Sequence, residues 1–454
     1  MQTEQTLRTD SNAYNQGTKQ MQLLHEELNA TLNFHKLNTL LNNGKARDIA
    51  DEPCHNDEAC LVIGSGASLE DALPLLKDWK GGIICTTSHA LTLVKFGAPP
   101  THIFALDPFC TQEEIEGVDW TQYGTKLITV PSVWPSLIEY WPNEMLLYRQ
   151  SMGNPQSFYA STLNHMYCDR YLISEEECLA ICARDKIERS KFNSARAYKF
   201  VPRIRTEVTL FACSPPVQVF VAHLMGYKSI FLVGCDFAYT KNKDRFTNWT
   251  MENGEWVAHE NPLVEDNVHL TTTNGILSST VHIYYKKNML SALRLLLNDD
   301  PTVQLVTTDH GAITELPYID IEHVVEKQGK HIARSKSGQQ LADDIEVYLA
   351  SVGAHCIFAD IGKQRSAMVF MESANPEKEI LDHMIKMNLA YRCTVCGAEV
   401  MAPQDTHDYE GKECPVCKRP MLHHKAKVNV DENMFRLRSR IVNAEKMKVE
   451  HASD

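Results

Sequence analysis

The stretch from Leu61 to Trp79, LVIGSGASLEDALPLLKDW, constrains the fold of this chain most, because three kinds of local structure follow one another in it without a gap. The apolar, branched residues 61–63 are typical of a buried parallel strand, and Gly64-Ser65-Gly66 ends that strand in a tight turn. Ser68 followed by Asp71 matches a capping box, which predicts that a helix begins there. Apolar side chains then recur at helical spacing at Leu69, Ala72, Leu73, Leu76 and Trp79. The stretch therefore predicts a strand, a glycine turn and an amphipathic helix.

The glycine turn lies where a negatively charged ligand would be stabilised. The first backbone N–H groups of a helix have no partner inside the helix, and the helix dipole adds about half a positive charge there. We therefore predict that Gly64, Ser65, Gly66 and Ser68 bind a phosphate or a carboxylate. Leu69 stands where a dinucleotide fingerprint needs its third glycine, and no Gly-Lys-Ser/Thr follows as in a P-loop. The alternative is a turn that only packs the helix against the sheet.

The next segments extend this pattern to a βαβαβ unit. Residues 83–86 are a predicted second strand, residues 89–96 a short helix, and residues 103–106 a third strand that ends at Asp107. Right-handed crossovers bring the carboxyl ends of such strands to one edge of a parallel sheet, where open α/β folds bind ligands. Thr87 and Ser88 are therefore expected to bind the ligand together with the glycine turn. Asp107 is a candidate for binding magnesium or a ribose, with a helix cap as the alternative.

A second acidic strand end lies further along the chain. Ser214-Pro215 begins a predicted helix, and the strand 230–233 that follows it ends at Gly234-Cys235-Asp236. Asp107 and Asp236 are therefore the candidate catalytic residues. Two such carboxylates beside the glycine turn suit a nucleotide transfer in which Mg²⁺ draws negative charge from the phosphates as the bond breaks. Sequence spacing alone does not determine whether these two side chains meet.

Three runs carry a resemblance to a known family: LVIGSGASLEDALPLL, HALTLVKFGAPPTHIFALDP and LMGYKSIFLVGCDFAY. In their order and gaps they resemble the 6-hydroxymethylpterin diphosphokinase MptE-like family, which also includes the bacterial motility accessory factors. The similarity extends over roughly residues 30–325 and includes TTTNGILSSTVHIYYKKNM and VQLVTTDHGAI. Two positions depart from the family pattern: Ala67 replaces a proline, and Cys235 replaces a polar residue that often precedes the later aspartate.

The resemblance implies a Rossmann-like core that binds a nucleotide or a nucleotide-sugar donor. It implies either diphosphoryl transfer from ATP to a pterin-type alcohol or transfer of a CMP-activated nonulosonic sugar to a protein acceptor. Both reactions begin with phosphates at the same sheet edge, so the residues leave the two open. A third alternative is a noncatalytic module that binds a nucleotide or a partner and carries a zinc ribbon.

The most specific motif of the chain is a pair of CxxC sequences near its C-terminus. Four cysteines form the two pairs, and residues 397–413 separate them, which is the spacing of a zinc ribbon. Four thiolates close the tetrahedral shell of Zn²⁺ and leave no position for water, so the predicted zinc is structural. A rubredoxin-like iron site is the alternative. The predicted ligands are Cys393, Cys396, Cys414 and Cys417.

Composition limits the remaining function classes. The chain has 454 residues, of which 43% are hydrophobic, and a formal net charge of −13. The acidic balance speaks against a bulk surface that binds nucleic acid, except through the ribbon. No apolar run approaches the ~20 residues of a membrane span, and the N-terminus lacks a signal-peptide pattern. Most of the 14 cysteines are scattered singly, as in a reducing compartment. We therefore expect a cytoplasmic protein.

These observations together predict an α/β protein with a Rossmann-like, doubly wound and mainly parallel sheet, N-terminal helices and a C-terminal zinc ribbon. The expected domains are an N-terminal helical segment at residues 1–52 and the MptE-like core at 53–325. An accessory or linker unit at 326–390, the ribbon at 391–424 and a charged tail at 425–454 follow.

Overall fold

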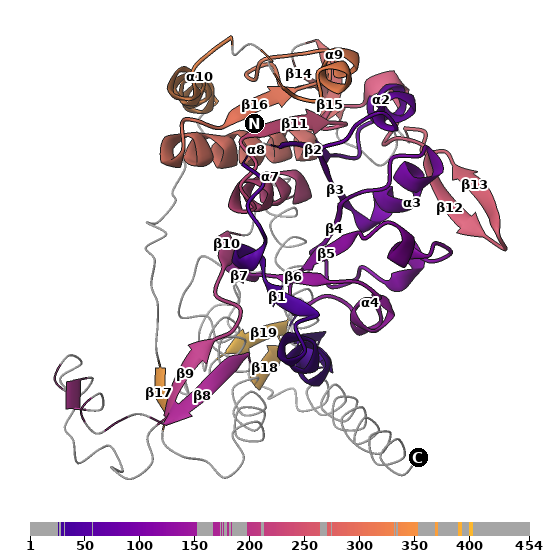
Figure 1. The fold of residues 1–454 in the computed structure, drawn as a ribbon. Helices are drawn as coiled ribbons and strands as arrows, with labels where there is room; N and C mark the ends of the chain where they lie inside the picture. Colours follow the sequence, from indigo (N-terminus) through magenta and orange to yellow (C-terminus); the bar gives the residue numbers. More distant parts are fainter. Residues whose placement is uncertain are drawn as a thin grey trace. The chain divides into compact units, whose positions relative to one another are not determined.

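The structure is a computed structural model that describes most of residues 32–151 and 198–352 (Figure 1). Within these two ranges the description omits residues 57, 210–212, 264–269, 274, 331 and 333–334. Outside them it covers residues 26, 29–30, 167–172, 174, 176, 179–180, 183, 368–370, 389–392 and 399–402. The chain divides into two compact units: residues 35–160 with 203–365, and residues 1–34 with 161–202 and 366–454.

The larger unit is built on one parallel sheet of eight strands, in the order β1-β6-β5-β4-β3-β2-β11-β16. Every neighbouring pair in this sheet is parallel. In that order the strands are β1 (Ala46–Asp48), β6 (Met145–Leu147), β5 (Lys126–Thr129), β4 (His102–Ala105), β3 (Gly82–Thr86), β2 (Ala59–Ile63), β11 (Ser229–Val233) and β16 (Gln304–Thr307).

Burial explains why these short apolar runs form strands. All five residues of β2 are buried, as are four of the five in β11, because helices cover both faces of the sheet. The register places Ile63 opposite Val233, and Leu232 opposite Thr307. The carboxyl ends of β2, β11 and β16 therefore lie next to one another.

The helices show that the sheet is doubly wound. Going from β2 to β6 the chain moves along the sheet in one direction, with α2 (Leu69–Leu76) and α3 (Thr87–Lys95) as crossovers. From β11 to β16 it moves in the opposite direction through α8 (Thr280–Asp299). Because crossovers are right-handed, the two groups of helices cover opposite faces (Figure 1). Contacts join α7 (Ser214–Leu224) and α10 (Gly338–Ser351) to α8, and α9 (Ile321–Glu326) to α2.

Smaller elements surround this sheet in the larger unit. The hairpin β12-β13 packs on α3, and a second hairpin, β14-β15, leads directly into α8. The bounds of these and the other elements are β7 (Arg149–Ser151), β10 (Glu207–Thr209), β12 (Asn248–Glu252), β13 (Glu255–His259), β14 (Leu270–Thr273), β15 (Ile276–Ser279), α4 (Pro135–Tyr140), η1 (Ile49–Asp51), η2 (Gln112–Glu114), η3 (Trp120–Gln122) and η5 (Thr240–Asn242).

In the smaller unit the structure describes two small antiparallel sheets. One has the order β17-β9-β8, and the other pairs β18 with β19. Their strands are β8 (Cys168–Leu172), β9 (Tyr198–Pro202), β17 (Met368–Phe370), β18 (Leu389–Arg392) and β19 (Glu399–Ala402).

The predicted α/β class and the βαβαβ unit are confirmed, because β2, α2, β3, α3 and β4 follow one another in the predicted order. The segment predicted as N-terminal helices is helical at residues 32–42, but it also contributes the edge strand β1 and the 3₁₀ turn η1. Among the described residues, no helix combines the length and the apolar character that crossing a membrane requires.

The predicted capping box at the start of α2 is wrong. Ser68 is the N-cap residue, but its side chain makes no capping bond to the helix, and the Asp71 carboxylate pairs with Lys241 at 2.7 Å. The helix ends at Leu76, so the indole of Trp79 lies beyond it and donates to the Gly82 carbonyl at 3.1 Å. The Ser68 side chain has a more distant partner, which defines the candidate site.

Candidate functional site

The candidate site lies at the carboxyl ends of β2 and β11, where the strand order reverses. Chain segments leave β2 toward β3 on one side and leave β11 toward β16 on the other, which defines a topological switch point. Ligands of open α/β sheets bind outside the carboxyl ends of strands at such a point. Gly64-Ser65-Gly66 follows β2, and Gly234-Cys235-Asp236 follows β11.

Asp236 occupies the start of α2, where the sequence predicts a phosphate. The Ser68 N–H donates to Asp236 Oδ2 at 3.0 Å, and the Ser68 hydroxyl contacts Asp236 Oδ1. The Thr240 hydroxyl also donates to Oδ2. Only 1% of Asp236 is exposed. The N–H groups of Leu69, Glu70 and Asp71 donate to the carbonyls of Gly66, Ala67 and Ser68, so Asp236 accepts only the Ser68 N–H, while its negative charge opposes the positive end of the helix dipole.

Gly66 makes room for this carboxylate. A Cβ atom at residue 66 would lie 2.3 Å from Asp236 Cγ and 2.5 Å from its Oδ2, distances that real Cβ contacts do not reach. The Gly66 N–H donates to the Gly234 carbonyl at 2.7 Å. Gly311 has a similar role, because its Cβ would lie 2.5 Å from the Asp236 backbone. At Gly66 the structure therefore favours the packing alternative that the sequence left open.

Asp309 is a third member of this group, and the sequence analysis did not single it out. It lies two residues after the end of β16 and accepts two backbone N–H groups, from Gly234 to Oδ1 and from Cys235 to Oδ2, each at 2.9 Å. Asp309 Oδ1 also lies 3.0 Å from the Ser68 hydroxyl. The available signal was an aspartate two residues after a short strand, a pattern similar to that of Asp236, which lies three residues after β11.

The two buried carboxyl groups affect each other. Burial raises the pKa of Asp309 to about 7, and the negative charge of Asp236 adds to this rise. The N–H groups of Gly234 and Cys235 oppose this rise, as does a hydrogen bond donated by the Ser68 hydroxyl, because each stabilises the ionised form. Only 6% of Asp309 is exposed, so burial dominates. This cluster, which we call the Asp-Ser-Asp link, consists of Asp236, Ser68 and Asp309 and joins three strand ends.

The start of α3 is a second helix end at the same edge, and no side chain caps it. Its N-cap residue, Thr86, directs its hydroxyl toward the Ser88 hydroxyl at 3.0 Å and also contacts His89 Nδ1. Ser88 is exposed, whereas Thr87 is buried and its hydroxyl donates to Glu114. Two of the predicted binding residues, Thr87 and Ser88, therefore form the first turn of a helix whose amides are available to an anion.

His89 holds the two strand ends together at this edge. Its ring stacks on Phe246 with the ring centres 5.0 Å apart, and the Phe246 N–H donates to the Ser65 carbonyl at 3.1 Å. Burial and the positive charge of Arg245 lower the pKa of His89 to about 4, so the ring is neutral near pH 7. His89 therefore contributes packing and adds no positive charge for a phosphate.

Asp107 is exposed and lies beyond β4, where its Oδ1 accepts the Phe109 N–H at 2.9 Å. This bond closes a local turn. Glu114 lies nearby: burial raises its pKa, and the Asp107 charge contributes to the rise, while the bond from Thr87 opposes it. The edge at the start of α3 thus combines open amides, hydroxyl groups and a half-buried acid.

A single magnesium ion does not fit Asp107 and Asp236 together. In the sheet β4 is separated from β11 by β3 and β2, and three strand spacings amount to about 14 Å. The oxygens of Asp236 already accept bonds from Ser68 and Thr240. Among the residues that the structure describes, no three His, Cys, Asp or Glu side chains are arranged to hold a metal ion. Cys393, Cys396, Cys414 and Cys417 lie outside the described residues, so the zinc ribbon stays a prediction.

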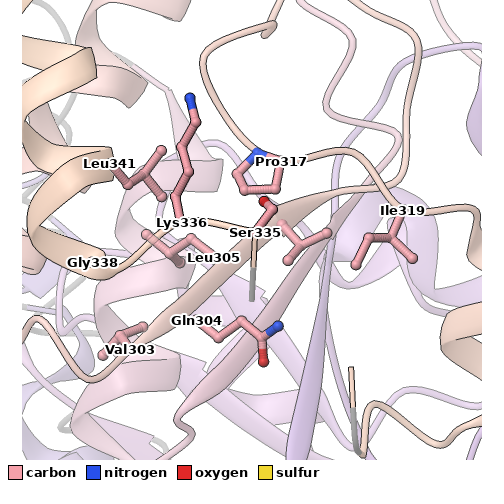
Figure 2. A pocket seen from close by; sticks show the side chains of 10 residues that line it. Val303, Gln304, Leu305, Pro317, Ile319, Ser335, Lys336, Gly338 and Leu341 are labelled. Carbon is pink, nitrogen blue, oxygen red and sulfur yellow. The ribbon is translucent and has the colours of Figure 1, made fainter. Parts of the chain in front are cut away.

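Figure 2 shows a pocket away from this edge, against the outer side of β16. Leu305 and Val306 of the strand, Pro317, and Leu341 of α10 contribute to its lining. Its volume of about 20 Å³ holds about one water molecule. The Lys336 ammonium points out of the pocket in Figure 2 and pairs with Asp344 at 2.6 Å. A pocket of this size does not hold a nucleotide.

The fold and the site define a doubly wound α/β protein with a polar edge at its switch point. No family model and no curated protein matches the chain, so the MptE-like resemblance stays a prediction. A MAf glycosyltransferase from Magnetospirillum magneticum AMB-1 is similar with a TM-score of 0.38 and 13% identity over 73% of this chain. The match spans 42% of that protein, so this chain corresponds to less than half of its length. The sialyltransferase CstII from Campylobacter jejuni, solved in complex with a substrate analogue, cytidine-5'-monophosphate, gives a TM-score of 0.21 and 13% identity over 58% of this chain and 86% of its own.

Proposed function

We propose that this protein is a nucleotide-dependent transferase that binds the phosphates of its donor at the start of α3. One observation carries the proposal: α3 begins at the carboxyl edge of the sheet, beside the switch point, and no side chain caps its first turn. The exposed hydroxyl of Ser88 and the half-exposed hydroxyl of Thr86 add donors next to these amides. Helix starts with free amides bind phosphates without a lysine.

The sequence predicts that the glycine turn binds the phosphate, whereas in this proposal Gly64 and Gly66 mainly pack the turn against the segment that follows β11. The Ser68 N–H and hydroxyl already bond to the Asp236 carboxylate. We therefore assign phosphate binding to Thr87 and Ser88 at the same edge of the sheet. Ser65 is exposed and borders the same edge, where it faces a donor. Gly64 and Gly66 keep the turn close to β11, because a Cβ at either residue would overlap atoms of the Gly234–Asp236 segment.

A transfer to an alcohol needs a group that takes the proton of the acceptor hydroxyl, and Glu114 is placed for this task. Its carboxylate contacts Thr87 at the first turn of α3, and its raised pKa makes it a stronger base than an ordinary glutamate. Asp107, exposed beside it, faces the acceptor or a donor ribose in the proposed complex. Diphosphoryl transfer to a pterin-type alcohol and glycosyl transfer from a CMP-activated sugar both release such a proton, so Glu114 serves either reaction.

A thermal-shift panel tests the nucleotide site. The native chain is heated with ATP, GTP, CMP and CMP-linked sugars, each with and without magnesium. A ligand at 100 times its Kd stabilises the folded protein by about 2.7 kcal/mol. Ser88→Asp places a carboxylate in the first turn of α3, so it should abolish the shift. Ser214→Asp places the same charge at the start of α7 and should leave the shift unchanged. Equal responses of both variants would refute binding at α3.

A turnover experiment separates the transferase from the noncatalytic module. The native chain and Glu114→Gln are incubated with the nucleotide that gave the shift, and breakdown of the donor is followed by chromatography, with a pterin alcohol or a protein as acceptor. We expect both proteins to bind the donor and only the native chain to consume it. A native chain that binds the donor without ever consuming it would favour the noncatalytic module.

A further inference from the structure

The Asp-Ser-Asp link contains one hydrogen fewer than its contacts require when both carboxyl groups are ionised. The Ser68 hydroxyl lies within hydrogen-bond distance of Asp236 Oδ1 and of Asp309 Oδ1. A serine hydroxyl carries one hydrogen and can donate it to only one of these oxygens, although it can accept a second bond. Two hydrogen bonds through Ser68 therefore need one further proton, which one of the two carboxyl groups must supply.

We propose that Asp309 is a positioning residue that holds this proton, donates it to the Ser68 hydroxyl, and thereby keeps Asp236 bonded to the N–H of Ser68, the N-cap residue of α2. In this arrangement Ser68 donates to Asp236, which stays ionised and also accepts the Ser68 N–H and the Thr240 hydroxyl. A protonated Asp309 still accepts the Gly234 and Cys235 N–H groups, because both of its oxygens keep free lone pairs. Every hydrogen bond of the link is then satisfied.

The surroundings of the link place the proton on Asp309 and not on Asp236. Asp236 receives three donors: the Ser68 N–H at the start of α2, the Ser68 hydroxyl and the Thr240 hydroxyl. Asp309 faces the negative charge of Asp236 in a buried position. None of the described residues that shift the pKa of Asp309 is a cation. The titratable groups around the link are Cys235 beside both carboxyl groups, Tyr318 beside Asp309 and His282 beside Asp236, with exposed His310 next to Asp309 in the chain.

This inference does not depend on the transferase proposal, because it follows from the hydrogen-bond geometry and needs no donor for its test. Infrared spectra of the full chain, labelled with ¹³C in its aspartate carboxyl groups, are recorded across the pH range from 5 to 9. The native chain should show a protonated carboxyl band at pH 5.5 to 6, where ordinary aspartates are ionised, and should lose it near pH 7. Asp309→Asn should lack the band. Asp320→Asn, at an exposed helix N-cap, should keep it.

Ser68→Ala provides a second measurement if Asp309→Asn does not fold. The protonated link has two hydrogen bonds through Ser68, whereas the fully ionised link has one, so removing the hydroxyl costs the protonated form more. The midpoint of the band should therefore fall by about one pH unit, which corresponds to one lost hydrogen bond. A midpoint that rises in Ser68→Ala, or a native chain without the band, would show that Ser68 donates to an ionised Asp309 and would overturn the proposal.

Discussion

Gly66→Ala tests whether close packing of the glycine turn on Asp236 holds the three strand ends together. The new Cβ would lie 2.3 Å from Asp236 Cγ and 2.7 Å from its Cβ, so Asp236 must leave its position. Overpacking costs about 1–3 kcal/mol, and each hydrogen bond to a charged group contributes about 1.5–3 kcal/mol. Losing the Ser68 N–H bond together with the overlap gives a destabilisation of about 4 kcal/mol.

The measurement is the melting temperature of the full chain. One kcal/mol shifts the melting temperature of a domain of about this size by roughly 2–4 °C, so Gly66→Ala should lower it by roughly 8–16 °C. Gly254→Ala is a control, because a Cβ there meets no atom within 4 Å. Its backbone φ of +85° is unfavourable for alanine, so this variant measures a conformational cost of about 1–2 kcal/mol without any overlap.

A double-mutant cycle identifies the atoms responsible. Asp236→Gly removes all three atoms that the new Cβ would meet, so Gly66→Ala should cost less than about 1 kcal/mol in that background. Costs of Gly66→Ala that are the same with and without the Asp236 side chain would refute the reasoning. Such additivity would mean that the glycine is required for its backbone conformation and not for contact with Asp236.

Two further predictions concern protonation and metal. The raised pKa of Asp309 means that between about pH 4 and pH 7 the folded chain binds more protons than the unfolded chain, so stability should fall as pH rises through this window, by roughly 4 kcal/mol in total. Denaturant midpoints measured from pH 4 to pH 8 check this, and the corresponding slope should be absent from Asp309→Asn. The zinc prediction requires about one zinc ion per chain in elemental analysis of the purified protein, and loss of that zinc from Cys393→Ser. A zinc-free native chain would contradict the ribbon.

The local part of this structure can be predicted from the sequence, because it depends on neighbouring residues. The apolar run of β2, the glycine turn after it and the helical spacing of α2 are all contained in one stretch of 19 residues, 61–79. Turn and helix periodicity act over such distances. Asp107 and Asp236 could be recognised as residues at strand ends for the same reason.

The partners of these residues could not be predicted, because they come from distant parts of the chain. Ser68 and Asp236 are 168 positions apart, and Ser68 and Asp309 are 241 positions apart. Ser68 with Asp71 satisfies the local pattern of a capping box, in which the Asp71 side chain would accept the Ser68 N–H. In the structure the buried Asp236 carboxylate, which follows β11, accepts that N–H instead, and Asp71 pairs with Lys241. The order of the strands, which places β11 between β2 and β16, decides this competition, and no local pattern contains that order.

The same competition makes a final prediction about which helix start receives a phosphate. In the native chain the Asp236 carboxylate accepts the Ser68 N–H at the start of α2. Inorganic phosphate should therefore bind mainly at the start of α3, where no side chain caps the amides. Asp236→Ala should be destabilised, because the Ser68 N–H and hydroxyl lose their acceptor. Phosphate then has a second helix start to bind, so it should raise the melting temperature of this variant by more than that of the native chain. Sodium chloride at equal ionic strength controls for screening of charges. If phosphate stabilises both proteins equally, the α2 start is not an anion site at all, and Asp236 holds the turn by packing alone.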